Sequence, residues 1–230
     1  MPISQKDMKM NAPVALAERT MGGLHEFLVG VIESLRISRT ARILDVGCGT
    51  GALVSRLSRH GFENAIGVDL DPPKNMGKPV FHRLDLNHHE DLKLGQFDLV
   101  TCVEVIEHIE NIGNLLDYIK STLAPDGIAI ITTPNIESTR ARIRALISTK
   151  VPHFDEKSDP THLMPILRDS LEKMLVRRDM SIERSMNYPA DQSKTVAYGK
   201  AVRFARNLTK LVVKDELYGD NLVHIIRHKG

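Results

Sequence analysis

From residue 41 to residue 135 the sequence alternates short apolar runs with segments of helical periodicity, and this alternation limits the possible folds most strongly. Apolar strands separated by amphipathic helices are typical of a parallel sheet with helices on both faces. The pattern therefore predicts an α/β, doubly wound fold. The predicted strands are 42–46, 64–69, 79–84, 97–103 and 127–133, with helices between them at 51–60 and 112–123.

Outside this region the periodicity predicts more helices and a late pair of strands. The helices are expected over 14–36, 136–148 and 168–178, the first with an interruption at Gly22 and Gly23, and the strands over 181–187 and 221–227.

The segment 194–214 contains no acidic residue, and its apolar and basic residues recur at helical spacing. This predicts an amphipathic helix with a basic polar face. Such a helix can pack on the core as an ordinary surface helix, lie on an anionic membrane, or cover a substrate.

The composition is that of a globular chain, and we expect a single domain over residues 1–230. The chain is 42% hydrophobic and 26% charged. No apolar run approaches the ~20 residues of a membrane span. The N-terminal sequence lacks the apolar core of a signal peptide, so a cytoplasmic protein is expected. Cys48 and Cys102 are the only cysteines and indicate neither a disulfide framework nor a zinc site.

Charge is distributed unevenly along the chain. Residues 1–137 carry 13 Lys or Arg against 18 Asp or Glu, a net charge of −5, whereas residues 138–214 carry 16 against 8, a net charge of +8. The basic half is either a solvated surface or a region that meets an anionic partner.

A glycine-rich turn follows the first predicted strand in the sequence ILDVGCGTG, residues 43–51. Glycine permits positive φ and close approach of the backbone, so this turn is expected to present backbone N–H groups to a ligand. The spacing of Gly47, Gly49 and Gly51 is G-x-G-x-G. It differs from the G-x-G-x-x-G of dinucleotide-binding folds and disfavours a nicotinamide-dependent oxidoreductase.

Acidic residues also end the next strands. Asp69 follows the second apolar run and Asp85 the third. Because ligands bind at the carboxyl ends of parallel strands, these side chains should gather at one edge of the sheet. Asp69 could accept hydrogen bonds from two ribose hydroxyls, and Asp85 one from the exocyclic amine of adenine.

In order and interval, the segments ILDVGCGTG, IGVDLD, LDL and FDLVTCVEVIEHI resemble class I S-adenosylmethionine-dependent methyltransferases over residues 41–135. The resemblance implies a seven-stranded sheet whose last strand is antiparallel, with S-adenosylmethionine (SAM) as cofactor. Asp45 would hold the turn and approach the amine of the cofactor. The cofactor-binding residues that it implies are Asp45, Gly47, Cys48, Gly49, Gly51, Asp69, Leu70, Asp85, Leu86, Val103 and Glu104.

The sequence EVIEHI, followed by TTPN and PTH, is similar to the branch that contains ubiquinone-biosynthesis O-methyltransferases and, more distantly, small-RNA 2′-O-methyltransferases. The resemblance implies Glu104, Glu107, His108 and His162 as catalytic residues and as ligands of a divalent cation. Carboxylates and imidazoles suit Mg²⁺ or Mn²⁺. Two alternatives stay open: Glu107 and His108 could act as an acid–base pair without metal, or the set could make purely structural contacts.

The expected function is SAM-dependent O-methylation of a small-molecule or lipid-linked hydroxyl acceptor. An RNA or sugar methyltransferase and a non-catalytic binding protein of the same fold are the alternatives. The basic segments favour peripheral contact with an anionic membrane, while an aromatic content of 4% disfavours nucleic acid. Residues 1–40 are expected to form an N-terminal helical cap, and 136–178 and 188–220 acceptor-side insertions or a lid.

Overall fold

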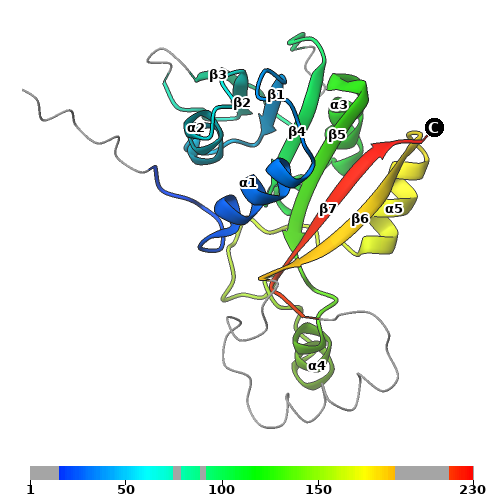
Figure 1. The fold of residues 1–230 in the computed structure, drawn as a ribbon. Coiled ribbons are helices and arrows are strands. Elements are labelled where there is room, and N and C mark those ends of the chain that lie inside the picture. The colour runs from blue at the N-terminus through cyan, green and yellow to red at the C-terminus, as the bar shows by residue number, and fades with distance from the viewer. Residues whose placement is uncertain (1–15, 75–78, 89–91, 190–217, 230) are drawn as a thin grey trace, which may run out of the picture.

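Seven strands form one mixed sheet in the computed structural model, which describes residues 16–74, 79–88, 92–189 and 218–229. The strand order is β3-β2-β1-β4-β5-β7-β6 (Figure 1). The strands are β1 Ile43–Val46, β2 Ala65–Asp69, β3 Val80–Arg83, β4 Phe97–Val103, β5 Leu123–Pro134, β6 Met180–Tyr188 and β7 Asn221–His228.

In this sheet β7 alone runs in the direction opposite to the other six strands. β1 pairs in parallel with β2 and β4, β2 with β3, and β4 with β5, whereas β7 is antiparallel to both β5 and β6. This confirms the predicted, mostly parallel seven-stranded sheet with an antiparallel last strand. The strand order reverses at β1 and β4, and in such sheets ligands bind outside the carboxyl ends of the strands at this switch point.

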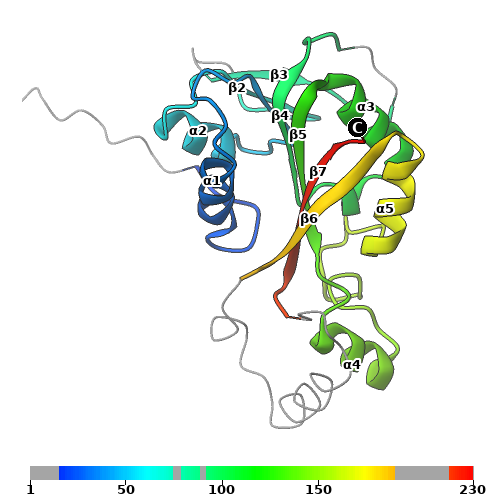
Figure 2. The same cartoon turned by 45° about the vertical axis from the view of Figure 1, so that its right-hand side comes forward.

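Helices cover both faces of the sheet (Figure 2). α1 (Leu24–Ser34) and α2 (Ala52–Arg59) bury their apolar residues in the core of one face. α3 (Ile112–Thr122) and α5 (Arg168–Val176) do the same on the other face. The two layers leave the strands between them largely buried, which is why the strand segments read as continuous apolar runs.

α4 (Thr139–Ser148) belongs to neither layer and projects beyond the edge at which β5 ends (Figure 1). It begins at an N-cap, Ser138, whose hydroxyl accepts a hydrogen bond from the Ala141 N–H at 3.2 Å. Among its residues only Thr139 and Ala141 are buried.

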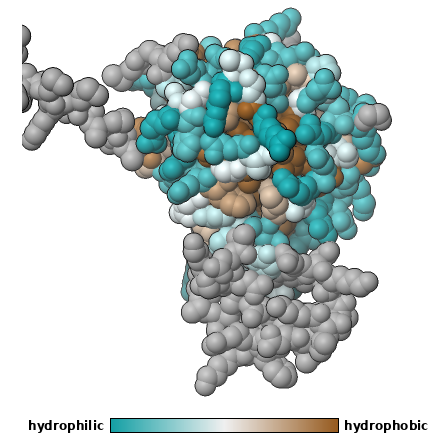
Figure 3. All heavy atoms as spheres, in the orientation of Figure 1, coloured by the Kyte–Doolittle hydropathy of each residue, from teal (hydrophilic) through white to brown (hydrophobic). Residues whose placement is uncertain are grey.

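The face seen in Figure 1 is hydrophilic at its rim and apolar toward its middle, as Figure 3 shows. Three half-buried side chains, Phe27, Met186 and Tyr188, pack against the buried core to which α1 and α2 contribute. The rings of Phe27 and Tyr188 lie 5.0 Å apart. This contact joins α1 to the end of β6.

The first helix is shorter than the predicted 14–36. Gly23 is the N-cap of α1 and has a φ of 82°, a left-handed conformation that a right-handed helix cannot contain, so α1 begins only at Leu24. Residues 16–23 are not helical and lie beside the glycine turn, where the Ala17 carbonyl accepts a hydrogen bond from the Thr50 hydroxyl at 2.7 Å. The N-terminal segment thus covers the turn in an irregular conformation.

The other elements agree with the predicted ranges to within a few residues, and a short 3₁₀ helix, η1 (Ile106–His108), follows β4. The predicted basic helix 194–214 and most of the segment 188–220 lie outside the described residues. Within the described part of the chain, no helix is both long and apolar enough to cross a membrane.

Candidate active site

A cavity of about 380 Å³ lies at the edge of the sheet where β1, β2 and β4 end. All predicted cofactor residues except Gly51 line it, as does His108, whereas Glu107 and His162 do not. The lining residues are Arg19, Thr20, His25, Asp45, Gly47, Cys48, Gly49, Thr50, Ala52, Asp69, Leu70, Leu84, Asp85, Leu86, Asn87, Val103, Glu104, Val105, His108, Ile109, Asp159 and Thr161.

Packing within the protein, and not space for a ligand, requires glycine at positions 47 and 51. Their φ angles are 74° and 76°. A Cβ at Gly47 would lie 2.3 Å from Cγ2 of Val105, and one at Gly51 would lie 2.5 Å from Cζ of Phe81. At Gly49 the added Cβ would meet only Cδ of Arg19, at 4.0 Å. Of the three glycines, Gly49 alone leaves open space on the side of the cavity.

The N–H groups of the turn donate to acceptors inside the protein. Those of Gly47 and Cys48 donate to the Val68 carbonyl at 2.8 and 3.0 Å, and that of Gly49 donates to Oδ2 of Asp69 at 2.8 Å. The expectation that these groups face a ligand is therefore wrong. Backbone pairing with the neighbouring strand satisfies them, and the Gly49 contact fixes the Asp69 carboxylate at the cavity wall.

Asp45 is the most deeply buried acid of the cavity, with 3% of its surface exposed. Oδ1 accepts a hydrogen bond from the Thr101 hydroxyl at 2.7 Å. Burial raises the pKa of Asp45 to about 7, against the effect of that hydrogen bond. A cation bound in the cavity would favour the ionised carboxylate.

Asp85 lies two residues after the end of β3 and stays charged. Its carboxylate accepts a hydrogen bond from the Asn87 N–H at 3.0 Å and pairs with Nδ1 of His88 at 2.8 Å. Both contacts lower the pKa of Asp85, and the hydrogen bond from the Asn87 backbone has the larger effect. The cavity therefore has an anionic end beside the apolar side chain of Leu86.

The N-terminal segment contributes a cation that the sequence patterns did not indicate. Arg19 lines the cavity beside Gly49. Its neighbour Glu18 forms an ion pair with Arg56 of α2, which anchors the segment over the turn. Arg19 belongs to no recognisable motif, and only the folding of residues 16–23 over the turn places it at the site.

Glu104 follows β4 in the left-handed conformation, with a φ of 53°. Oε1 accepts a hydrogen bond from the Thr132 hydroxyl at 2.8 Å, and Oε2 accepts one from the side-chain amide of Asn221. Burial raises the pKa of Glu104 to about 7, although both hydrogen bonds act in the opposite direction. The two donors fix the carboxylate at the cavity wall.

Glu107, His108 and His162 form a compact cluster beside the cavity. One ligand atom of each lies within 4.8 Å of the others, whereas Glu104 is not part of the group. Glu107 is 0% exposed, and neither of its carboxylate oxygens has a hydrogen-bond partner among the described residues. Burial, and then the nearby charge of Glu104, raises its pKa well above the usual range. Three of the four predicted metal ligands thus come together.

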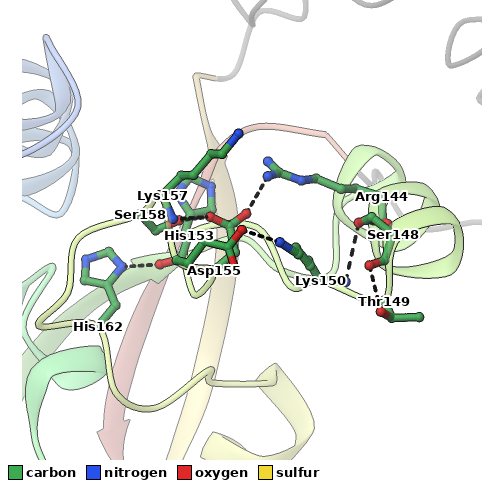
Figure 4. Close-up of polar contacts among 10 residues, drawn as sticks. Arg144, Ser148, Thr149, Lys150, His153, Asp155, Lys157, Ser158 and His162 are labelled. Atoms are coloured by element: carbon green, nitrogen blue, oxygen red, sulfur yellow. Dashed lines mark hydrogen bonds and ion pairs between the residues drawn. The ribbon is translucent and has the colours of Figure 1, made fainter.

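The two histidines of the cluster are oriented by carbonyl groups. Nδ1 of His108 lies 3.1 Å from the Thr161 carbonyl, and Nδ1 of His162 lies 2.7 Å from the His153 carbonyl (Figure 4). A carbonyl can only accept, so each Nδ1 is assigned the proton and each Nε2 the lone pair. Metal-binding histidines are commonly oriented in this way. Glu107, whose carboxylate oxygens have no hydrogen-bond partner among the described residues, adds an oxygen ligand that a bound cation would ionise. These three residues fit a divalent cation.

The loop before α5 is fixed to η1 and to α4. The N–H groups of Leu163 and Met164 donate to the Glu107 carbonyl at 2.8 and 3.0 Å. Earlier in the loop, Asp155 pairs with Arg144 of α4 and accepts a hydrogen bond from the Lys157 N–H at 3.0 Å (Figure 4). These contacts carry Asp159 and Thr161 to the cavity.

Comparison with known families agrees with this geometry. A family model described as a methyltransferase domain matches residues 17–184. The ubiquinone biosynthesis O-methyltransferase of Psychrobacter cryohalolentis is 32% identical over a match covering 41% of this chain and 41% of that protein. That of Rickettsia typhi is 36% identical, with the same shares. The chain thus matches less than half the length of these curated relatives.

Solved structures share the fold. A SAM-dependent methyltransferase of Archaeoglobus fulgidus is 23% identical, with a TM-score of 0.56 over 89% of this chain and 94% of that one. The magnesium protoporphyrin IX methyltransferase of Synechocystis PCC 6803, solved with bound S-adenosylhomocysteine (SAH), is 14% identical, with a TM-score of 0.56 over 90% and 82%. At such identities the likeness establishes the fold of SAM-dependent methyltransferases.

Proposed function

Because the chain belongs to the methyltransferase domain family, we propose that it transfers a methyl group from SAM to a hydroxyl of a small-molecule or lipid-linked acceptor. One observation carries this proposal. A single cavity joins the acids at the ends of β1, β2 and β4 to His108 and to the loop residues Asp159 and Thr161. Cofactor and acceptor can therefore meet in it.

In the proposed complex the cofactor lies along the acidic wall. Asp69 accepts hydrogen bonds from the ribose hydroxyls, and Asp85 accepts one from the adenine amine beside Leu86. Asp45 faces the ammonium group of the methionine portion. Arg19 supplies the guanidinium of the cavity lining and binds the methionine carboxylate.

His108 is the proposed general base. SAM, when bound, supplies a methyl group that its positively charged sulfur has already activated. The acceptor oxygen forms a bond to the methyl carbon, the S–C bond breaks with its electron pair left on sulfur, and the hydroxyl proton passes to Nε2 of His108. Burial lowers the pKa of His108, which keeps the ring neutral and able to accept a proton at pH 7.

A second candidate mechanism includes a divalent cation, Mg²⁺ or Mn²⁺, held by Glu107, His108 and His162. The two unpartnered oxygens of Glu107 favour it, and so does the orientation of both histidines by carbonyl groups. When bound, such a cation would lower the pKa of a coordinated hydroxyl. The remaining predicted ligand, Glu104, accepts hydrogen bonds from Thr132 and Asn221 instead.

The first experiment measures binding by calorimetry with SAM, SAH and NAD. We expect both methionine-derived ligands to bind and NAD not to bind, and Asp69→Ala to lower both affinities at least tenfold. Binding of NAD in place of SAM would overturn the proposal.

The second experiment follows SAH formation with catechols, prenylated phenols, glycosides and RNA oligonucleotides as acceptors. Turnover with a hydroxyl acceptor that is lost in His108→Gln supports the proposed reaction. Turnover with RNA alone would identify an RNA methyltransferase. SAM binding without turnover on any acceptor would indicate a non-catalytic binding protein.

We also propose that α4 brings the site to an anionic membrane, from which a lipid-linked acceptor is taken. Leu146 and Ile147 on α4 are 84% and 80% exposed, and exposed Arg142 and Lys150 lie close to them in sequence. Apolar residues beside basic ones fit an anionic lipid surface. Sedimentation with phosphatidylglycerol vesicles tests this: Leu146→Ser with Ile147→Ser should reduce binding several-fold. Binding that is unchanged in the double variant, or equal with neutral phosphatidylcholine vesicles, would overturn it.

A further inference from the structure

We infer that Thr132 and Asn221 are positioning residues that hold the Glu104 carboxylate against the reacting sulfur, so that the cavity binds SAM more tightly than SAH. The inference rests on the proposed SAM site. It concerns residues of β5 and β7, which lie outside the glycine turn and the acidic strand ends.

The Thr132 hydroxyl makes two contacts with the same residue. It accepts a hydrogen bond from the Glu104 N–H at 3.0 Å and donates one to Oε1 at 2.8 Å. Thr132 is fully buried on β5, next to β4 in the sheet. The paired contacts hold both the left-handed backbone of Glu104 and the direction of its side chain.

Asn221 supplies the second donor, from the first residue of β7. Its side-chain amide donates to Oε2 of Glu104. The backbone before it is fixed by Asn135, whose side-chain amide donates to the Tyr218 carbonyl at 2.9 Å and whose N–H donates to the Asp220 carbonyl at 2.8 Å. Asn221 therefore reaches Glu104 from a rigid position.

Two donors fix one carboxylate at the wall of the cavity, next to Val103 and Val105. SAM carries a positive charge on sulfur and SAH does not, while the rest of the two molecules is the same. In the proposed complex the reacting sulfur lies between the cofactor acids and His108, and Glu104 lines this same cavity. A fixed anion there discriminates between the two molecules by charge, and discrimination falls when the carboxylate is free to turn away. Such discrimination favours substrate binding and product release.

The test measures dissociation constants of SAM and SAH by calorimetry at pH 8 for four variants. Thr132→Val, Asn221→Leu and Glu104→Gln should each weaken SAM binding about tenfold and SAH binding less than threefold. Thr132→Ser, which keeps the hydroxyl, should restore the wild-type ratio of the two constants.

Thr133→Val is the matched control. Thr133 is the next residue on β5, it is equally buried, and its hydroxyl has no hydrogen-bond partner among the described residues. Its loss should leave both constants unchanged. SAH binding also reports that each variant is folded around the site.

The inference would be overturned if Thr132→Val and Asn221→Leu left the ratio of the SAM and SAH dissociation constants unchanged, whether both affinities fell equally or neither fell. Wild-type protein that binds neither ligand would overturn the proposed function itself. Wild-type protein that binds both, with a ratio insensitive to these variants, would leave the proposed function intact and refute the positioning role alone.

Discussion

The cavity has two halves that are built in different ways. The half that we propose for the cofactor, here called the cofactor half, comprises the lining residues from Asp45 to Val105, and the segments that directly follow β1, β2, β3 and β4 supply most of it. The half that we propose for the acceptor, here called the acceptor half, comprises His108, Ile109, Asp159 and Thr161 and adjoins Glu107 and His162. It depends on the contact between His108 and Thr161, which are 53 residues apart in the chain.

The difference lies in what fixes each half. Backbone hydrogen bonds between neighbouring strands and close packing against Val105 and Phe81 hold the cofactor half. Two backbone N–H groups bonded to the Glu107 carbonyl, and two histidine rings bonded to backbone carbonyls, hold the acceptor half. Most of these groups lie in a loop that can change sequence as long as those few contacts remain. A substitution in the first half should therefore damage the fold, and one in the second should change chemistry at little loss of stability.

The largest effect is expected for Gly47→Ala. A Cβ there combines a φ of 74° with an approach of 2.3 Å to Val105, so the free energy of unfolding should fall by about 4 kcal/mol. Gly49→Ala has open space and should lose only about 1 kcal/mol. Urea denaturation of both variants measures this, and equal losses would show that packing does not hold the turn.

The pH dependence of stability should reveal the buried Asp45. Its folded pKa of about 7 lies above the unfolded value of 3.8, so the native state binds the extra proton between these values. The contribution of Asp45 to stability is then highest at low pH and is lost as pH rises toward 7. In the ligand-free protein it falls by about 3 kcal/mol between pH 4.5 and pH 7.5.

Asp45→Asn should remove the contribution of Asp45 and leave those of Glu104 and Glu107, which have the same sign because burial raises their pKa values too. Asp126→Asn, an exposed control on β5, should leave the whole pH dependence unchanged. Denaturant unfolding of the wild type and of both variants at pH 4.5, 6 and 7.5 gives the pH dependence of stability for each protein. If stability falls between pH 4.5 and pH 7.5 as much in Asp45→Asn as in the wild type, the pH dependence arises from other groups and not from Asp45.

On the acceptor side, Glu107→Met should stabilise the metal-free protein. It replaces two buried oxygens that lack a hydrogen-bond partner in the described part of the chain with an apolar group of similar size. This should add about 2 kcal/mol to the free energy of unfolding in the presence of EDTA. Thermal unfolding with EDTA and with Mn²⁺ measures both parts of this prediction.

Under the cation hypothesis, Mn²⁺ raises the melting temperature of the wild type and of the exposed control Glu110→Met but not that of Glu107→Met. If Mn²⁺ stabilises none of the three proteins, the acid–base mechanism without metal is retained.

The smallest effect is expected for Arg19→Met, which should leave stability nearly unchanged. SAH affinity should fall about tenfold, or about 1.4 kcal/mol, because a charge-assisted hydrogen bond to the carboxylate is lost. 5′-Methylthioadenosine lacks that carboxylate and should bind wild type and variant equally. An equal loss of affinity for both ligands would indicate that Arg19 contacts a part of the cofactor other than the carboxylate.

Much of the cofactor half could be predicted because its signals are local. The strand ends that place Asp45, Asp69 and Asp85 follow from apolar periodicity, and all three do line one cavity. The role given to the glycines was less accurate. The glycine spacing predicted a turn. It did not indicate that Val105 occupies the space beside Gly47 and Phe81 the space beside Gly51.

The acceptor half could be predicted only as a set of residue types. The sequence placed Glu104, Glu107, His108 and His162 together, but not that Glu104 turns toward Thr132 and Asn221 and leaves Glu107 without a partner. Arg19 carried no signal at all.

The sequence by itself determined the sheet, the turn after β1 and the acids at the strand ends, because hydrophobic periodicity and glycine spacing act within a few residues. Only the tertiary structure decided which side chains meet. Glu104 and Asn221 are 117 residues apart, and His162 is oriented by the carbonyl of His153. Such contacts depend on how strands and loops pack in space, and no local pattern encodes that.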